Sequence, residues 1–126
     1  MLKQVVGHVK VIVQFYAHVE ARGIKSNQYQ VRCLNLDTGA TYTFSFYDAT
    51  DKKEKHHEDL MKDVLSTIKL NSRYTEEAFP NFESFANECG YNVDNSKDKE
   101  VYLNFLKSGK SIRNVFTEEL LETLPD

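Results

Sequence analysis

The stretch Phe79–Asp94 constrains the fold most, because it carries both the start and the stop signal of one helix. Asn81 follows Pro80 and can cap the first turn by accepting a hydrogen bond from a backbone N–H. Gly90 stands where helices end in the left-handed conformation, and Tyr91 stands where an apolar residue packs against that end. The face expected to be buried repeats at intervals of three and four residues. It comprises Phe82, Phe85, Ala86 and Cys89.

Helical spacing continues to the C-terminus. Asp94, Asn95 or Ser96 can cap a second helix, whose middle is weakened by Gly109. Thr117 can cap a short last helix. The apolar faces of these two helices comprise Val101, Tyr102, Phe105, Leu106, Ile112 and Phe116 in the first, and Leu120, Leu121 and Leu124 in the second.

A further helix is expected upstream, from about Glu54 to about Lys69. Asp51 and Glu54 stand in the relation of a capping box, and Asn71 is a plausible left-handed stop. The apolar face of this helix comprises Leu60, Met61, Val64, Leu65 and Ile68.

The N-terminal part alternates with a period of two, which is typical of strands with one buried face. Val5–Ala21 is expected to be one long strand, followed by a polar connection, Arg22–Asn27, around Gly23. A helix is the competing interpretation of the first stretch, but its β-branched residues disfavour it. The odd positions that predict the strand are Val9, Val11, Val13, Phe15, Ala17 and Val19.

A hairpin is expected next, with arms Tyr29–Leu36 and Thr41–Tyr47 joined by a turn at Asp37–Ala40. The second arm alternates cleanly between aromatic and hydroxyl side chains. The first arm changes parity between Cys33 and Leu34, which a bulge or burial on both faces would explain.

The order of strands first and helices after predicts an α+β fold, in which a small antiparallel sheet of three strands packs against three to four α-helices. Residues 1–126 are expected to form a single domain, with the sheet in residues 1–50 and the helices in residues 51–126.

Charge is unevenly distributed along the chain. Residues 1–70 carry ten Lys/Arg and eight Asp/Glu, a net of +2, whereas residues 71–126 carry six and eleven, a net of −5. A basic footprint for duplex nucleic acid is therefore absent. The acidic half can meet a basic surface of a partner, although a solvated helical face is the more common role of such charges.

The two cysteines, Cys33 and Cys89, lie far apart and match no zinc-finger spacing. Reduced thiols are therefore expected. The N-terminus lacks the apolar segment of a signal peptide, and no run is long enough to span a membrane. The sequence thus predicts a soluble intracellular protein.

The stretch Ser108–Ser111 reads Ser-Gly-Lys-Ser, which invites comparison with a phosphate-binding loop. Such a loop needs another glycine five residues before Gly109, where Asn104 stands, and it opens a helix rather than lying inside one. The stretch is therefore interpreted as a turn of helix. It contributes to a small basic strip that can touch phosphates but is more often a solvated face. The strip comprises Lys107, Lys110 and Arg113.

Other side chains that could bind a metal or react as nucleophiles are not expected to come together in one site. His56 and His57 diverge by about 100° on a helix and cannot close on one metal ion. His8 and His18 are expected on the solvated face of the first strand. Cys89 is expected to be a core residue rather than a nucleophile. No catalytic, cofactor-binding or metal-binding residue is predicted, so we expect a non-enzymatic protein without a cofactor.

Aromatic rings of the hairpin can form a platform that stacks on the bases of a single-stranded nucleic acid. Packing beneath helices is the more common use of such rings, because basic residues between them are few. The rings belong to Tyr29, Tyr42, Phe44, Phe46 and Tyr47. The basic residues available to this alternative function are Lys10, Arg32, Lys107, Lys110 and Arg113.

The C-terminal half also contains a pattern of aromatic, glycine and acidic residues. They are Phe82, Phe85, Gly90, Tyr91, Asp94, Lys97, Tyr102, Phe116 and the acidic Leu-rich residues 118–124, preceded by the strand Phe44–Tyr47. In this set the chain resembles small accessory proteins of tailed bacteriophages and prophages. It departs from their pattern at Asn92, Asn95 and Asp98. The matched residues have packing or capping roles, so the resemblance implies an origin and a fold but no site.

Several phage proteins of this kind inhibit host enzymes or host defences. The resemblance therefore implies a phage-encoded binding protein in the host cytoplasm, which inhibits a host or defence-system protein by direct contact. A second copy of the chain is a further partner, because a long first strand can pair within the chain or across a dimer. The partner-binding residues expected in the acidic half are Glu83, Asn87, Glu88, Asp94, Asp98, Glu118 and Glu119.

Overall fold

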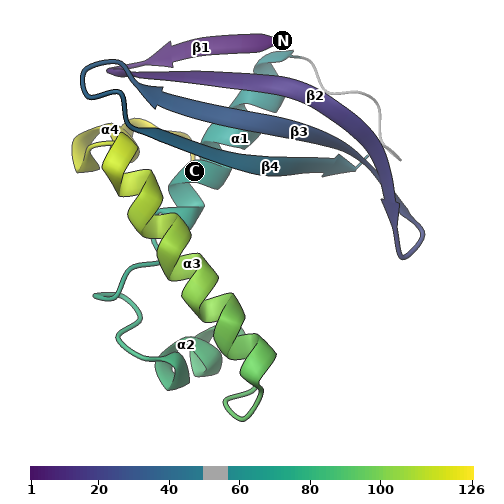
Figure 1. Cartoon of the computed structure of the whole chain (residues 1–126), viewed down its shortest axis with the longest axis vertical. Helices are drawn as coiled ribbons and strands as arrows, with labels where there is room; N and C mark the ends of the chain where they lie inside the picture. The colour runs from purple at the N-terminus through teal and green to yellow at the C-terminus, as the bar shows by residue number, and fades with distance from the viewer. Residues whose placement is uncertain (50–56) are drawn as a thin grey trace.

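The computed structural model describes residues 1–49 and 57–126 and shows four strands followed by four helices (Figure 1). The α+β class with an antiparallel sheet is confirmed, but the sheet has four strands instead of three. The strands are β1 (Leu2–Val6), β2 (Val9–Ala21), β3 (Ile24–Asn35) and β4 (Thr41–Ala49). The helices are α1 (His57–Asn71), α2 (Phe82–Cys89), α3 (Ser96–Val115) and α4 (Glu118–Thr123).

The additional strand arises from a turn at Gly7 and His8, which divides the predicted strand Val5–Ala21 in two. Val6 pairs directly with Val9 across this two-residue turn, and β1 then runs antiparallel to β2 within the same chain. Gly7 has a φ of 58°, a conformation that glycine adopts without steric cost. The prediction was wrong here because the period of two continues on both sides of the turn, and no Asn-Gly or Asp-Gly pair marks it.

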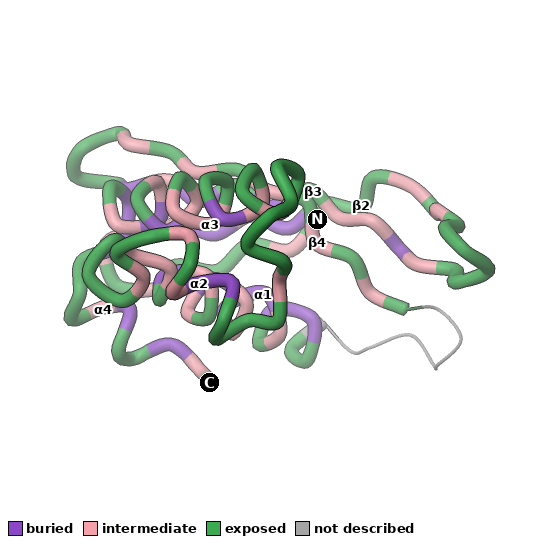
Figure 2. The backbone as a smooth tube through the Cα atoms, turned by 90° about the horizontal axis from the view of Figure 1, so that it is seen from below, coloured by how far each residue is buried: buried purple, intermediate pink, exposed green. Residues whose placement is uncertain are grey.

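The connection between β2 and β3 is also shorter than predicted. Ala21 pairs with Ile24, so Arg22 and Gly23 alone form the turn, with φ values of 52° and 78°. The rest of the predicted connection, up to Asn27, belongs to β3. Residues 20–25, at the end of this hairpin, are exposed throughout (Figure 2).

A bulge in β2 changes which side chains face the helices. The pairing register with β3 shifts between Phe15 and Ala17, which leaves Tyr16 as the additional residue. Before the bulge the odd residues of β2 face the helices, and after it His18 lies opposite Asn27 on that same side. In β3 the pairing with β2 continues without a register shift at Leu34, so no bulge lies there. Leu34 is half-buried on the face opposite to Cys33, and Leu36 is exposed.

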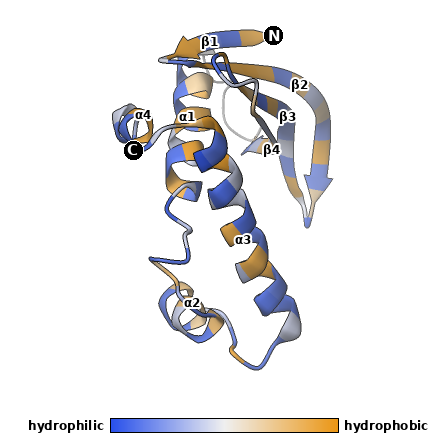
Figure 3. Cartoon of the chain, turned by 60° about the vertical axis from the view of Figure 1, so that its left-hand side comes forward, coloured by the Kyte–Doolittle hydropathy of each residue, from blue (hydrophilic) through white to orange (hydrophobic). Residues whose placement is uncertain are grey.

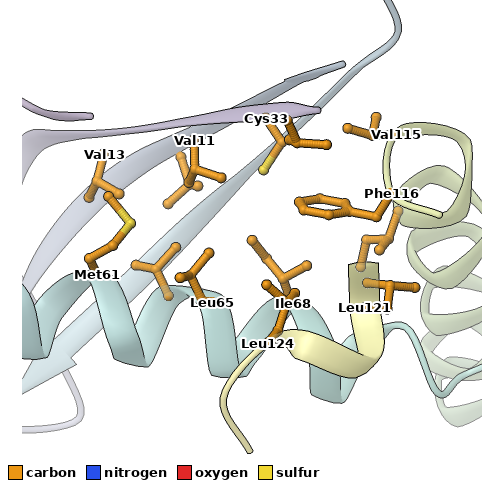
Figure 4. Close-up of a cluster of buried hydrophobic side chains, with 14 of the residues drawn as sticks. Val11, Val13, Cys33, Met61, Leu65, Ile68, Val115, Phe116, Leu121 and Leu124 are labelled. Atoms are coloured by element: carbon orange, nitrogen blue, oxygen red, sulfur yellow. The ribbon is translucent and has the colours of Figure 1, made fainter. Parts of the chain in front are cut away.

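The main core lies between one face of the sheet and the helices α1, α3 and α4 (Figure 4). Val11 and Val13 of β2 point toward Met61 and Leu65 of α1, and Phe116 enters beside them. The buried members of this core are Val9, Val11, Val13, Val31, Cys33, Leu60, Met61, Val64, Leu65, Ile68, Ile112, Val115, Phe116, Leu121 and Leu124.

A second, aromatic cluster holds α2 against the N-terminal half of α3, away from the sheet (Figure 3). Phe85 is buried there, and its ring lies 5.1 Å from that of Tyr102 and 5.2 Å from that of Tyr91. The Tyr102 hydroxyl donates a 2.8 Å hydrogen bond to the carbonyl oxygen of Phe79. Phe85 and Tyr102 are buried but lie outside the main core, so the described residues form two separate apolar cores.

The N-termini of α2, α3 and α4 and the C-terminus of α2 follow the predicted capping residues. The Asn81 side chain accepts from Ser84 N–H, and Asn95 and Thr117 cap α3 and α4 in the same way. Gly90 ends α2 in the left-handed conformation with a φ of 79°. These predictions are confirmed because capping depends on neighbours within a few residues.

The predictions for Cys89 and for the end of α1 were wrong. Cys89 is exposed, although we expected it in the core, because the two-turn helix α2 rests on α3 through Phe85 and Ala86. Helix α1 is described from His57 and extends to Asn71, two residues beyond the predicted end. The predicted left-handed stop at Asn71 is wrong, because Asn71 is the last helical residue and its φ is not positive. The predicted capping box of Asp51 and Glu54 lies outside the described residues.

Candidate interaction surface on the uncovered face of the sheet

One face of the sheet has no helix over it in the described part of the chain, because α1, α3 and α4 all pack against the other face (Figure 1). The cross-strand register brings side chains from all four strands together on this uncovered face. Lys3 lies opposite Ile12, Ile12 opposite Arg32, and Arg32 opposite Thr43. The row beside it contains Val5, Lys10, Leu34 and Thr41, and the row on the other side contains Gln14, Gln30 and Ser45.

Three cations therefore lie close together on the uncovered face. Lys3 and Arg32 flank Ile12 from the two neighbouring strands, which places their backbones roughly 10 Å apart. Lys10 lies two residues from Ile12 on the same face of β2. Lys3 and Arg32 are exposed and Lys10 is half-buried, so all three charges can be reached from solvent.

Strand residues with acidic side chains are absent from this face. The four strands contain two of them, Glu20 and Asp48. Asp48 lies opposite Asn27, which faces the helix side, and the bulge at Tyr16 turns Glu20 to that side as well. The uncovered face thus carries positive charge without a compensating carboxylate among its strand residues, although the whole chain has a net charge of −3.

The centre of the uncovered face is a shallow hollow of about 430 Å³. Its lining includes the cations Lys3 and Arg32 and the apolar side chain of Ile12. Beside it the amides of Gln28 and Gln30 donate to the Ser45 hydroxyl at 3.3 and 3.2 Å. The face therefore combines positive charge, hydrogen-bonding groups and a small apolar centre. Gln14, Gln30 and Thr43 complete the polar lining of the hollow.

The predicted aromatic platform lies on the opposite, helix-covered face. Tyr42, Phe44 and Phe46 are half-buried and pack against the main core together with Tyr29. Burial raises the pKa of the Tyr42 hydroxyl. Their expected use as core side chains is therefore confirmed, and of the five rings only Tyr47 lies on the uncovered face, where it is 56% exposed.

The five basic residues predicted for nucleic acid do not form one surface. Lys10 and Arg32 lie on the uncovered face, whereas Lys107 and Lys110 are exposed on α3, which packs against the other face. Arg113 has a structural role: its guanidinium donates two hydrogen bonds, of 2.9 and 3.2 Å, to the Ser72 carbonyl oxygen.

The acidic residues predicted to bind a partner are divided between two places. Glu83, Asn87 and Glu88 are exposed on α2, with Asp94 and Asp98 at the adjacent start of α3. The Asp98 carboxylate accepts a 2.9 Å hydrogen bond from Asn92 N–H, so it also shapes that cap. Glu118 and Glu119 lie in the first turn of α4, at the far end of α3, where Glu118 forms an ion pair with Arg113. A common docking surface for the whole set is therefore not formed, and each group alone stays a prediction.

Histidine and cysteine side chains do not assemble a reactive site in the described residues. No three His, Cys, Asp or Glu side chains come together as metal ligands there, and His56 lies outside them. His8 lies in the β1–β2 turn, and His18 lies on the helix side of the sheet, where its Nδ1 is 2.7 Å from Asn27 Oδ1. Both positions differ from the solvated strand face that the sequence predicted, because the turn and the bulge were missed.

The thiol of Cys33 is fully buried, and burial raises its pKa to about 12. It is therefore protonated at neutral pH and unsuited to nucleophilic attack.

The helices of the described segments are too short or too polar to span a membrane.

Comparison of the chain with protein-family models, with curated proteins and with solved structures found no match in any of the three. The resemblance of the C-terminal half to phage accessory proteins therefore stays a prediction, and the uncovered sheet face is the surface on which a function can be proposed.

Proposed function

We propose that this protein is a binding protein that docks the uncovered face of its sheet onto an acidic surface of another protein and performs no chemistry of its own. The observation that carries this proposal is the cluster of Lys3, Lys10 and Arg32 on a face without acidic strand residues. Charge complementarity of this kind guides encounter and suppresses wrong partners. In line with the resemblance to phage accessory proteins, the partner would be a host or defence-system protein that binding inhibits.

The size of the face fits this role. Four strands spaced about 4.8 Å apart, with β3 about 40 Å long, present an area on the order of 600 Å². One partner of a standard protein interface buries about 800 Å². The half-buried Ile12 supplies an apolar centre, and the surrounding glutamine and hydroxyl side chains can form the hydrogen bonds of an interface rim.

An acidic protein surface fits the face better than a nucleic acid does. Single-stranded nucleic acids are bound by several aromatic rings interleaved with basic side chains, and Tyr47 is the one ring of the predicted platform on this face. The net charge of −3 would also repel a polyanion at long range. The nucleic-acid alternative therefore has three clustered cations in its favour but no stacking platform.

The test is affinity capture from nuclease-treated host lysate with three forms of the tagged protein. The first is wild type, and the second, Lys3→Glu with Arg32→Glu, reverses two charges on the uncovered face. The third, Lys97→Glu with Lys99→Glu, makes the same charge change at the exposed start of α3. We expect a protein in stoichiometric amount with wild type and with the α3 variant, and its loss with the sheet-face variant.

Recovery of the same protein with all three forms would contradict docking through this face. Recovery of nucleic acid from lysate without nuclease, lost in the sheet-face variant, would instead support the alternative function. A captured protein counts only when high salt weakens its binding, because salt screens the exposed charges on which the proposal rests.

A further inference from the structure

Strand β4 forms one edge of the sheet, with β3 as its only neighbour among the described strands (Figure 1). It is nine residues long and pairs with β3 without a bulge. In an antiparallel pair, alternate residues direct their N–H and C=O groups away from the neighbouring strand. The outer edge of β4 therefore presents a regular row of hydrogen-bonding groups.

These outer groups have no partner among the described residues. The backbone of Thr41–Tyr47 forms no hydrogen bond to any described segment other than β3. An edge that is unpaired by the described residues over the length of residues 41–47 is a template for another strand.

The two edges of the sheet differ in how they are protected. Strand β1 has five residues and carries Lys3, and both a short length and a lysine discourage edge-to-edge pairing. In β4, by contrast, residues 41–47 contain no charged side chain, no proline and no bulge. Features that prevent an edge strand from pairing with another chain are thus present in β1 and absent from residues 41–47 of β4.

We propose that the outer edge of β4 binds the same edge of a second copy of this chain, in antiparallel pairing centred on Phe44. The inference is independent of the proposed function, because it concerns the edge of the sheet and not its uncovered face. The strand is self-complementary about Phe44. Tyr42 of one copy then faces Phe46 of the other on the helix side, and Thr43 faces Ser45 on the uncovered side.

Both kinds of pair are favourable across antiparallel strands, since aromatic rings contact aromatic rings and hydroxyls contact hydroxyls. No like charges meet in this register, and Asp48 falls outside the paired residues 41–47. The two copies would share one sheet of eight strands with both uncovered faces on the same side, because a two-fold axis perpendicular to the sheet relates them.

The experiment measures molar mass in solution by sedimentation velocity across a range of protein concentrations. Wild type is expected at twice the chain mass of 14.6 kDa. Thr43→Lys combined with Ser45→Lys places like charges opposite each other twice across the dimer axis, so the mass should halve. Thr43→Lys combined with Ser45→Glu places opposite charges there, so the dimer should return.

The matched control is Gln14→Lys with Gln28→Lys, which adds the same charge to the uncovered face on the inner strands β2 and β3 without placing the two lysines opposite each other. It should remain dimeric, and circular dichroism should show the same fold for all variants. A monomeric wild type overturns the proposal, as does a double-lysine variant that stays dimeric. Failure of the lysine–glutamate variant to restore the dimer overturns the pairing centred on Phe44.

Discussion

Gly109 lies where α3 passes close to the end of α1 and the loop that follows it. It is buried, and a Cβ atom at this position would overlap the carbonyl oxygen of Tyr74 and lie 3.3 Å from that of Asn71. The sequence shows only a glycine that weakens a helix. The crossing that requires it joins residues more than thirty positions apart, which no local pattern reveals.

Gly109→Ala should therefore destabilise the protein, against the usual trend in helices. Alanine normally stabilises a helix interior by about 1 kcal/mol relative to glycine, whereas overpacking a close contact costs about 1–3 kcal/mol. Urea denaturation would measure the free energy of unfolding, with Asn104→Ala on the exposed side of α3 as the control. An equal or higher stability of Gly109→Ala would show that the contact with Tyr74 is unimportant.

The buried thiol of Cys33 should make the protein less stable as the pH becomes alkaline. Its thiol has a pKa of about 12 in the folded protein, against about 8.5 in an unfolded chain. Above the lower value the unfolded state loses a proton that the folded state keeps, so the free energy of unfolding falls as pH rises. Below the unfolded pKa the thiol is protonated in both states, so the contribution of Cys33 to the free energy of unfolding is fully present.

We expect a loss of about 1.4 kcal/mol for each pH unit between roughly pH 9 and pH 11. Denaturation of wild type, Cys33→Ala and Cys89→Ala over this range would measure it, since tyrosine ionisation is common to all three proteins. The difference between wild type and Cys33→Ala should shrink with pH, and Cys89→Ala should follow wild type. A constant difference would contradict the effect of burial on the Cys33 pKa.

Strands and helices were predictable to different degrees for a physical reason. Helix ends are set by side chains such as Asn81 and Gly90 that bond to backbone groups within a few residues, so the sequence announces them. The turn at Gly7 and the bulge at Tyr16 depend instead on which residue pairs with which across the sheet. Because the turn at Gly7 was not predicted, the cluster of cations on the uncovered face was not predicted either. Lys3 lies beside Ile12 only because the chain reverses direction at Gly7.

Helix α2 should behave as a cooperative unit of lower stability than the sheet. Its buried side chains belong to the aromatic cluster with α3 and not to the main core. Phe85→Ala removes the central ring, at a cost of about 3–5 kcal/mol to that cluster. Hydrogen exchange should then show fast exchange in residues 82–89 and protection retained in β2 and β3. Leu103→Ala, on an exposed position of α3, is the control, and equal loss of protection in the strands would contradict two separate cores.

At the scale of the whole molecule, positive and negative charge lie in different places. The cations on the sheet face away from the helical part, whose residues 71–126 carry the net charge of −5. The sequence predicted the imbalance between the two halves. It could not predict that Lys3, Lys10 and Arg32 converge, because their spacing of seven and 22 residues has meaning only in the register of three paired strands.

This segregation should let an acidic protein bind a cation exchanger. With a pI near 5.8 the chain carries net negative charge at pH 7, so uniform charge would leave it in the flow-through. We expect retention at moderate salt, about 0.1 M, because the Debye length is then about 10 Å, so the exchanger meets the cationic sheet face while the distant carboxylates are screened. Lys3→Glu with Arg32→Glu should abolish retention, whereas Lys97→Glu with Lys99→Glu, an equal change in net charge, should leave the elution position nearly unchanged. Equal loss of retention in both variants would mean that net charge, and not the sheet face, governs the behaviour of the molecule.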